Sequence, residues 1–201
     1  MKTNKYILLP TVFIAVMLYS CSPKNISTKY YYQNEKVLDS IEESYKEINS
    51  ATPFDVGFTS KDFTIVSLGI LTDSLKYIYE FKVGDNRLAD TLKKFGLPVK
   101  PVIELVKQMQ SIRCTWISSY DYYTDEKKQE LIFMSIKPVA LNAPLSYKKY
   151  YILTYFQQPQ YFDNDGLLLE RRKLKRLRKI NGEIFKRIND KVCYTVSTTY
   201  R

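Results

Sequence analysis

The sequence contains no histidine. This absence excludes a histidine general base, the Ser-His-Asp and Cys-His nucleophile systems, and every metal site that needs an imidazole ligand. No other residue pattern completes the set of groups that a named reaction needs. The sequence therefore predicts a protein that is not an enzyme and that has no cofactor and no metal site.

Long hydrophobic runs are scarce as well. The main one extends from Tyr6 to Tyr19, follows Lys2 and Lys5, and is too short for a transmembrane helix. Its length is typical of the apolar region of a signal peptide. It leads into Leu18-Tyr19-Ser20-Cys21, which resembles the lipobox of bacterial lipoproteins: an aliphatic residue, a variable residue, a small residue and then the lipidated cysteine.

The resemblance implies cleavage before Cys21 and a lipid on its sulfur. We expect residues 1–20 to be the signal peptide, 21–33 the lipidated cysteine with a tether, and 34–201 a single domain. Ser22 is not the aspartate that often signals retention in the inner membrane, so the outer membrane is favoured. The acidic cluster of some surface-exported lipoproteins is missing after Cys21, which favours the periplasmic face.

The rest of the composition is that of a globular domain. The chain has 201 residues, of which 45% are hydrophobic and 26% charged, which argues against disorder. Its formal net charge is +10. In a cytosolic protein this excess would indicate nucleic acid, but export makes an anionic lipid or an acidic glycan the better candidate partner. A solvated surface is the plain alternative.

Cysteine is the third scarce residue, with three in the chain. If Cys21 is acylated, only Cys114 and Cys193 keep thiols, and an envelope protein folds in an oxidising compartment. Each of the two lies near the start of a predicted strand. They are candidates for a disulfide, with two buried free thiols as the alternative.

Residue periodicity predicts an α+β fold, a mostly antiparallel sheet with helices packed on one face. Helices are expected near 34–50, over 85–95 and from Pro101 onward. Strands are expected at 63–71, 75–83, 114–123, 129–137, 148–157 and 193–199.

The segment 170–191 fits two structures. Leu174, Leu177, Ile180, Ile184 and Ile188 have helical spacing, whereas Asn181-Gly182 is typical of a hairpin turn. We favour the helix. On either structure the segment is strongly basic and is a candidate for contact with an anionic surface, through Arg171, Arg172, Lys173, Lys175, Arg176, Arg178 and Lys179.

Several other patterns have both a functional and a structural interpretation. Tyrosines at 30–32, 120–123 and 147–155 suggest a platform for sugar rings or, more simply, sheet packing. Acidic residues around Asp121 and 125–126 suggest paired catalytic carboxylates or a solvated turn. Residues 163–166 resemble part of a calcium loop, but the ligand spacing is incomplete and favours a turn. Ser146 and Lys149 match the Ser-x-x-Lys spacing of penicillin-binding enzymes without the companion motifs of that family.

Three short sequences resemble an O-glycosylation motif of exported bacterial proteins, Asp-(Ser/Thr)-(aliphatic, Ala, Met or Thr). They make Ser40, Ser74 and Thr91 candidate glycosylation sites, of which Ser74 is the best placed because it lies in a predicted turn. Asp-Ser turn chemistry is the structural alternative.

Together these patterns favour a non-catalytic lipoprotein that serves as an interaction or structural module of the cell envelope. Its expected partners are the membrane, through the N-terminal lipid, and other envelope proteins or an acidic glycan, but not nucleic acid. A protein that binds an anionic envelope component, either a lipid headgroup or an acidic glycan, is the second hypothesis. A hydrolase is the third.

Overall fold

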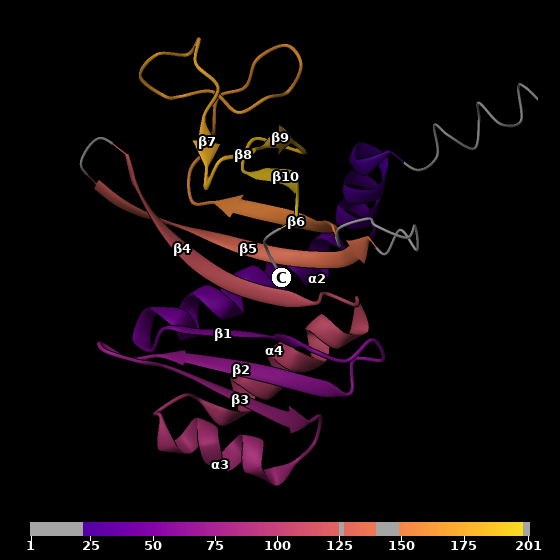
Figure 1. Ribbon diagram of the computed structural model, residues 1–201, viewed down its shortest axis with the longest axis vertical. Helices are drawn as coiled ribbons and strands as arrows, with labels where there is room; N and C mark the ends of the chain where they lie inside the picture. Colours follow the sequence, from indigo (N-terminus) through magenta and orange to yellow (C-terminus); the bar gives the residue numbers. More distant parts are fainter. Residues whose placement is uncertain (1–21, 125–126, 140–148, 199–201) are drawn as a thin grey trace, which may run out of the picture.

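The structure, a computed structural model, describes residues 22–124, 127–139 and 149–198. Its elements are α2 (Pro23–Ala51), β1 (Phe54–Phe58), β2 (Ile65–Leu71), β3 (Lys76–Lys82), α3 (Asn86–Lys94), α4 (Val99–Ser111), β4 (Trp116–Thr124), β5 (Lys127–Val139), β6 (Lys149–Phe156), β7 (Lys179–Ile180), β8 (Glu183–Ile184), β9 (Lys186–Arg187) and β10 (Val192–Ser197). Eight strands form one antiparallel sheet in the order β3-β2-β1-β4-β5-β6-β10-β9, with helices on one face (Figure 1). The α+β fold predicted from the sequence is confirmed.

Helix α2 begins earlier than the sequence suggested. We expected residues 21–33 to be a tether, but the helix starts at Pro23, and the side chain of Ser22 accepts a hydrogen bond from the backbone N–H of Asn25. Serine at the N-cap followed by proline at the first helical position is a strong start signal. Because Ser27 and Tyr31 are buried, this first part of the helix is already part of the domain.

Most of the other expected elements are present. The predicted hairpin of 63–71 and 75–83 appears as β2 and β3, paired from Ile65↔Lys82 to Leu71↔Lys76. Asp85 caps α3 by accepting a hydrogen bond from the backbone N–H of Arg87. Strand β1 was not expected; it lies in the middle of the sheet between β2 and β4.

The sheet has a hydrophobic core on each face. In the helix-side core, α2 and α4 pack against the strand residues that point toward them. Its members include Leu38 of α2, Leu105 of α4 and Ile132 of β5. The second core lies on the opposite face of β4, β5, β6 and β10 and includes Phe133, Phe185 and Cys193. Since neighbouring residues of a strand point to opposite faces, Ile132 and Phe133 belong to different cores.

The chain between β6 and β10, residues 157–191, covers the second core, and we call it the covering segment. It corrects our prediction of a helix at 170–191, which consists of a loop, the β7–β8 hairpin and β9. Asn181 and Gly182 both have positive φ, 52° and 79°, as a type I′ turn requires. They join β7 to β8 through the pairs Lys179↔Ile184 and Ile180↔Glu183. The turn chemistry determines the local structure, and the helical spacing of the leucines and isoleucines is coincidental.

Of the two alternatives for the remaining cysteines, the structure has the two buried free thiols and not the disulfide. Cys114 and Cys193 are free, buried thiols that belong to different cores on opposite faces of the sheet. Two strands, β5 and β6, separate β4 from β10, so the cysteines are roughly 14 Å apart at the usual strand spacing, well beyond disulfide reach. Burial raises the pKa of Cys114 to about 12 and also raises that of Cys193, so both thiols stay protonated.

Within the described ranges, no helix is both long and apolar enough to cross a membrane.

Candidate binding cleft

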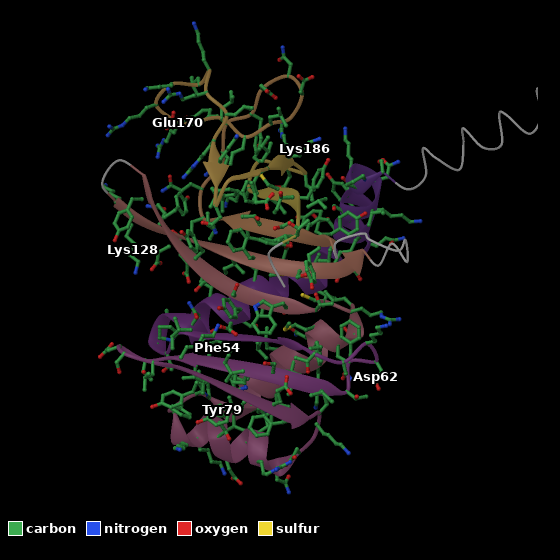
Figure 2. All side chains as sticks on the ribbon, viewed as in Figure 1. Phe54, Asp62, Tyr79, Lys128, Glu170 and Lys186 are labelled. Carbon is green, nitrogen blue, oxygen red and sulfur yellow. The ribbon has the colours of Figure 1, made fainter. Side chains whose placement is uncertain are left out.

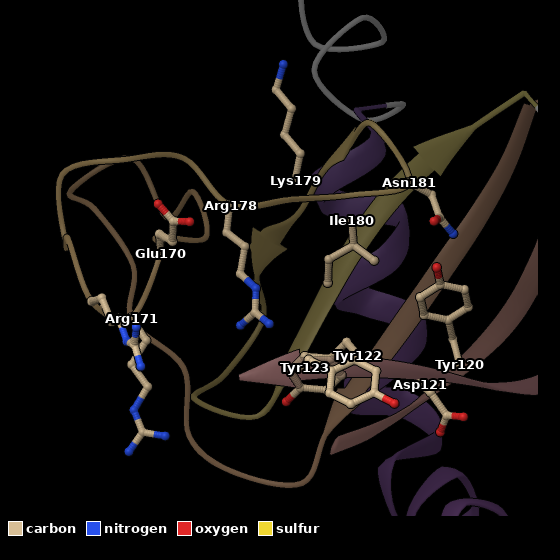
Figure 3. Close-up of a pocket in the computed structure, with 11 residues that line it drawn as sticks. Tyr120, Asp121, Tyr122, Tyr123, Glu170, Arg171, Arg178, Lys179, Ile180 and Asn181 are labelled. Carbon is tan, nitrogen blue, oxygen red and sulfur yellow. The ribbon is translucent and has the colours of Figure 1, made fainter. Parts of the chain in front are cut away.

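A cleft of about 590 Å³ lies where the end of β4 meets the segment that covers the second core. Two stretches distant in sequence form it, one from the β4 strand and one from the chain on either side of β7 (Figure 3). Its lining consists of Tyr120, Asp121, Tyr122, Tyr123, Glu170, Arg171, Arg172, Arg178, Lys179, Ile180 and Asn181.

Tyrosines form the strand side of the cleft. Tyr122 is only 9% exposed and packs its ring against that of Phe156, 6.1 Å away. Burial raises the pKa of Tyr122, and the nearby positive charge of Arg178 partly offsets this effect. Tyr120 and Tyr123 are exposed, Tyr123 to 72%. Tyr120 and Tyr122 are two residues apart on β4 and share one face of the strand, whereas Tyr123 alternates to the other. This face therefore presents one accessible ring, Tyr120, beside the fixed ring of Tyr122.

Arg178 links the two sides of the cleft. Its guanidinium lies 4.7 Å from the centroid of the Tyr122 ring, within the range of a cation–π contact. It also donates a hydrogen bond to Gln160, Nη1 to Oε1, at 3.1 Å. Figure 3 shows its side chain extending from the upper segment toward Tyr122. Arg178 is thus held in place by two neighbours.

The opposite side of the cleft is a loop that its own backbone closes. Glu170 and Arg176 are joined by a backbone hydrogen bond of 2.8 Å, and Leu169 pairs with Leu177. The carbonyl of Glu170 also accepts hydrogen bonds from the N–H groups of Lys173 and Leu174. We call residues 171–177 the basic loop. Its closure fixes where Arg171 and Arg172 leave the backbone.

The described lining is predominantly positive. Four cations line the cleft, namely Arg171, Arg172, Arg178 and Lys179, against the two carboxylates of Asp121 and Glu170. Asp121 forms an ion pair with Lys128 at 2.9 Å, which reduces its effect on a bound anion. Arginine donors with aromatic rings beside them are suited to a ligand that carries both a negative charge and a flat, weakly polar face.

The structure divides the predicted basic surface into two groups. Arg171, Arg172, Arg178 and Lys179 line the cleft, whereas Lys173, Lys175 and Arg176 do not. All seven belong to the covering segment, and six are exposed, with Arg178 half-buried.

Among the tyrosines that the structure describes, those of 120–123 contribute to the cleft. Tyr30 donates its hydroxyl hydrogen bond to the carbonyl of Ile112, and Tyr31, Tyr151 and Tyr155 are buried in the helix-side core. The platform interpretation therefore applies to one of the three groups, and packing explains these members of the other two.

Sequence reasoning missed the side chains that complete the site. Gln160, Ile180 and Asn181 hold or line it, but none belongs to a charged or aromatic run. The useful signal was Asn181-Gly182, because a hairpin at this point returns the chain over the sheet and places Arg178 above Tyr122.

The remaining candidates have structural roles or lie outside the described residues. Asp163 accepts hydrogen bonds from the backbone N–H groups of Asp165 and Leu167, which is the predicted turn. Residues 125–126 and 146–148, which include parts of the proposed carboxylate set and of the Ser-x-x-Lys motif, are outside the described ranges. In those ranges, no cluster of three or more acidic or cysteine side chains is arranged to hold a metal ion.

The three candidate glycosylation sites differ in access. Ser74 is exposed in the turn between β2 and β3. Ser40 is half-buried and accepts a hydrogen bond from Gln108 of α4, at 3.3 Å. Thr91 is half-buried on α3. Ser74 is the site that a glycosyltransferase could reach most easily.

The chain matches no protein-family model, no curated protein and no solved structure.

Proposed function

We propose that this protein is a non-catalytic, lipid-anchored module of the cell envelope that binds an acidic glycan in the tyrosine-lined cleft. The observation that carries the proposal is that tyrosines of β4 and four cations of the segment around β7 line one cavity of about 590 Å³, with Arg178 held against Tyr122. A cavity of this size suits a small number of sugar rings.

The chemistry of the lining supports a glycan with carboxylate groups. Sugar rings pack their C–H faces on exposed aromatic rings, and Tyr120, which shares a face of β4 with Tyr122 and is 42% exposed, supplies one. Guanidinium groups bind carboxylates with two parallel hydrogen bonds, and Arg178 is already held against Tyr122 and Gln160. Binding to a pre-positioned arginine costs less conformational entropy than binding to a mobile one.

The anchor is the second part of the proposal. Cys21 follows the lipobox-like Leu18-Tyr19-Ser20, and we expect it to carry the lipid that holds the protein on the periplasmic face of the outer membrane. Replacing Cys21→Ala should leave an unprocessed precursor without acyl label. A normally processed, acylated variant would end this part of the proposal.

The binding test uses the detergent-solubilised lipoprotein and oligogalacturonate, an oligosaccharide with one carboxylate per ring, with a neutral oligosaccharide of equal length as reference. Calorimetry should show binding to the acidic sugar alone. The double variant Tyr120→Ala/Arg178→Gln should weaken it by about tenfold or more, because an aromatic contact and a cation are each worth about 1 kcal/mol.

The matched control is Tyr32→Ala/Lys100→Gln, which removes an exposed tyrosine and an exposed lysine away from the cleft. It should bind the acidic sugar as the unmodified protein does. Equal weakening in both double variants, or equal binding of acidic and neutral sugars, would contradict the proposal. Binding of inositol phosphates in place of the oligogalacturonate would favour a lipid headgroup instead.

A further inference from the structure

The three cations of the basic loop that do not line the cleft share the loop with two exposed leucines. Lys173, Lys175 and Arg176 are exposed, Leu174 is 50% exposed and Leu177 is 39% exposed. A single exposed leucine is common on a protein surface, but two of them on one short loop, each with a cation on either side, form an amphipathic tip. Here the loop combines apolar tips with positive charge on both sides of each leucine.

The backbone of the loop has a defined turn at Leu174. Leu174 has φ of 46°, a conformation that costs a side chain other than glycine or asparagine about 1–2 kcal/mol. Its N–H donates to the carbonyl of Glu170, and the N–H of Lys175 donates to the carbonyl of Lys173. The tip is therefore a hydrogen-bonded turn with a defined shape.

The loop projects from one end of the molecule. In Figure 1 it forms part of the orange segment beyond β7, at the upper end of the long axis, and the indigo start of α2 lies toward the same end. Figure 2 shows side chains beside the labelled Glu170 extending away from the sheet. A hydrogen bond from Asn189 Nδ2 to Tyr31 Oη, 3.0 Å long, fixes the covering segment to the first part of α2.

We propose that the tip of the basic loop docks on the anionic surface of the membrane that holds the lipid anchor, with Leu174 and Leu177 entering the headgroup region and Lys173, Lys175 and Arg176 facing the headgroups. The inference goes beyond glycan binding and uses different side chains. It rests on the proposed lipid at Cys21, because that lipid places the same end of the molecule at the bilayer.

Charge and shape both select this occupant. A bilayer with anionic lipids attracts each nearby lysine or arginine and accepts apolar tips just below the headgroups. Each cation contributes about fivefold to the docking equilibrium, so the three together favour the docked state by about a hundredfold. With one lipidated cysteine already in the membrane, docking is intramolecular and needs no strong affinity of its own.

The test places an environment-sensitive nitrobenzoxadiazole dye on the tip. The variant Leu174→Cys is labelled under native conditions, in which Cys114 and Cys193 are buried. The lipidated protein is reconstituted into vesicles of phosphatidylcholine with or without phosphatidylglycerol. With phosphatidylglycerol, the emission should shift to the blue and quenching by acrylamide, which is uncharged, should fall. In phosphatidylcholine alone, or at high salt, the dye should stay accessible.

The control carries the dye at Ile78→Cys, which replaces an apolar residue that is 64% exposed on the edge strand β3. That strand lies at the opposite end of the long axis (Figure 1), so its dye should not respond to either vesicle. A dye at 174 that stays as quenchable as the dye at 78, in protein that floats with the vesicles, would overturn the inference. Protein that does not float with the vesicles would also overturn the inference, because it would show that no lipid at Cys21 anchors the protein.

A charge control completes the experiment. The triple variant Lys173→Gln/Lys175→Gln/Arg176→Gln should lower the ratio of docked to undocked protein about a hundredfold. The triple variant Lys93→Gln/Lys94→Gln/Lys100→Gln removes as many exposed charges from α3 and the start of α4 and should leave the blue shift intact. Equal losses in both triple variants would also overturn the inference.

Discussion

The two faces of the sheet are built differently. The helix-side core is covered by α2, of 29 residues, and α4, of 13 residues. The second core is covered by a segment whose strands β7, β8 and β9 have two residues each. Long helices carry their own backbone hydrogen bonds, whereas the covering segment depends on turns and isolated bridges. Every cation of the cleft belongs to the less regular cover.

This difference suggests a division of work between the faces. The helix-side core supplies most of the buried apolar surface, and hence most of the stability. The covering segment on the other face has little regular secondary structure, so few of its side chains are needed to stabilise the fold. More of them can therefore take part in binding. Regions that bind ligands commonly belong to the less stable part of a domain.

The largest expected effect is on the helix-side core. Leu38→Ala removes a fully buried side chain of α2 and should lower the free energy of unfolding by about 3 kcal/mol. Leu177→Ala is the same change at an exposed position of the basic loop and should alter it by less than about 0.5 kcal/mol. Urea titration of both variants measures this contrast, and similar midpoints would contradict it.

A second prediction uses the two buried thiols, since one reports on each face. We expect a thiol reagent to label Cys193 about tenfold faster than Cys114 in the native protein, an opening difference of about 1.4 kcal/mol. Mass spectrometry after limited labelling gives both rates. Faster labelling of Cys114 would reverse our comparison of the two faces. Because the thiols are free, labelling under denaturing conditions should be the same with and without reductant.

The Asn181-Gly182 turn of the covering segment gives a third prediction, with a smaller expected change in stability. Asn181→Ala places an ordinary side chain at φ of 52° and should destabilise the β7–β8 hairpin by about 1 kcal/mol. Labelling of Cys193 should accelerate and that of Cys114 should not. Asn181→Gly, which accepts this backbone conformation, is the control and should behave like the unmodified protein. Acceleration at both cysteines would show that the two faces open together.

The smallest effect concerns two acids of α2. Burial raises the pKa of Asp39 and Glu42 above their ordinary values of 3.8 and 4.5. The fold therefore disfavours the ionised forms of both side chains. Their contribution to the free energy of unfolding is greatest at low pH, where both are protonated, and is lost as pH rises through their pKa values in the folded protein. Asp39→Asn/Glu42→Gln should be slightly more stable than the unmodified protein at about pH 7, with the gap closing toward about pH 4. Urea titrations across this range measure it, and a gap that widens toward low pH would contradict the sign.

The success of sequence reasoning followed the strength of local signals. The alternation in 75–83 and the residues from Asp85 onward are local signals, and the strand β3 and the helix α3 that contain them were both predicted. Strand β1 was missed because it is short, is interrupted by Gly57 and has both faces buried, so it shows no alternation. For 170–191, apolar spacing favoured a helix, yet Leu174 and Leu177 are exposed and Ile180 is buried. The two-residue turn signal was the better guide.

The cleft could be predicted only in parts. The basic run and the tyrosines of 120–123 were both candidates, but their meeting depends on the strand order β4-β5-β6-β10 and on the hairpin that returns over it. No pairing rule in the sequence specifies that order. The same reason explains why the candidate disulfide does not form. Cys193 lies on β10 as expected, whereas Cys114 precedes β4, and the two thiols belong to cores on opposite faces.

The early start of α2 would limit the reach of the domain if Cys21 carries the lipid that we propose. Only Ser22 separates Cys21 from the first residue of the helix, and one extended residue spans about 3.5 Å. So short a connection to a lipid would let the domain pivot at the membrane surface but not move far from it. A ligand of the cleft would then have to reach the membrane, which would restrict the candidates to molecules found close to the bilayer.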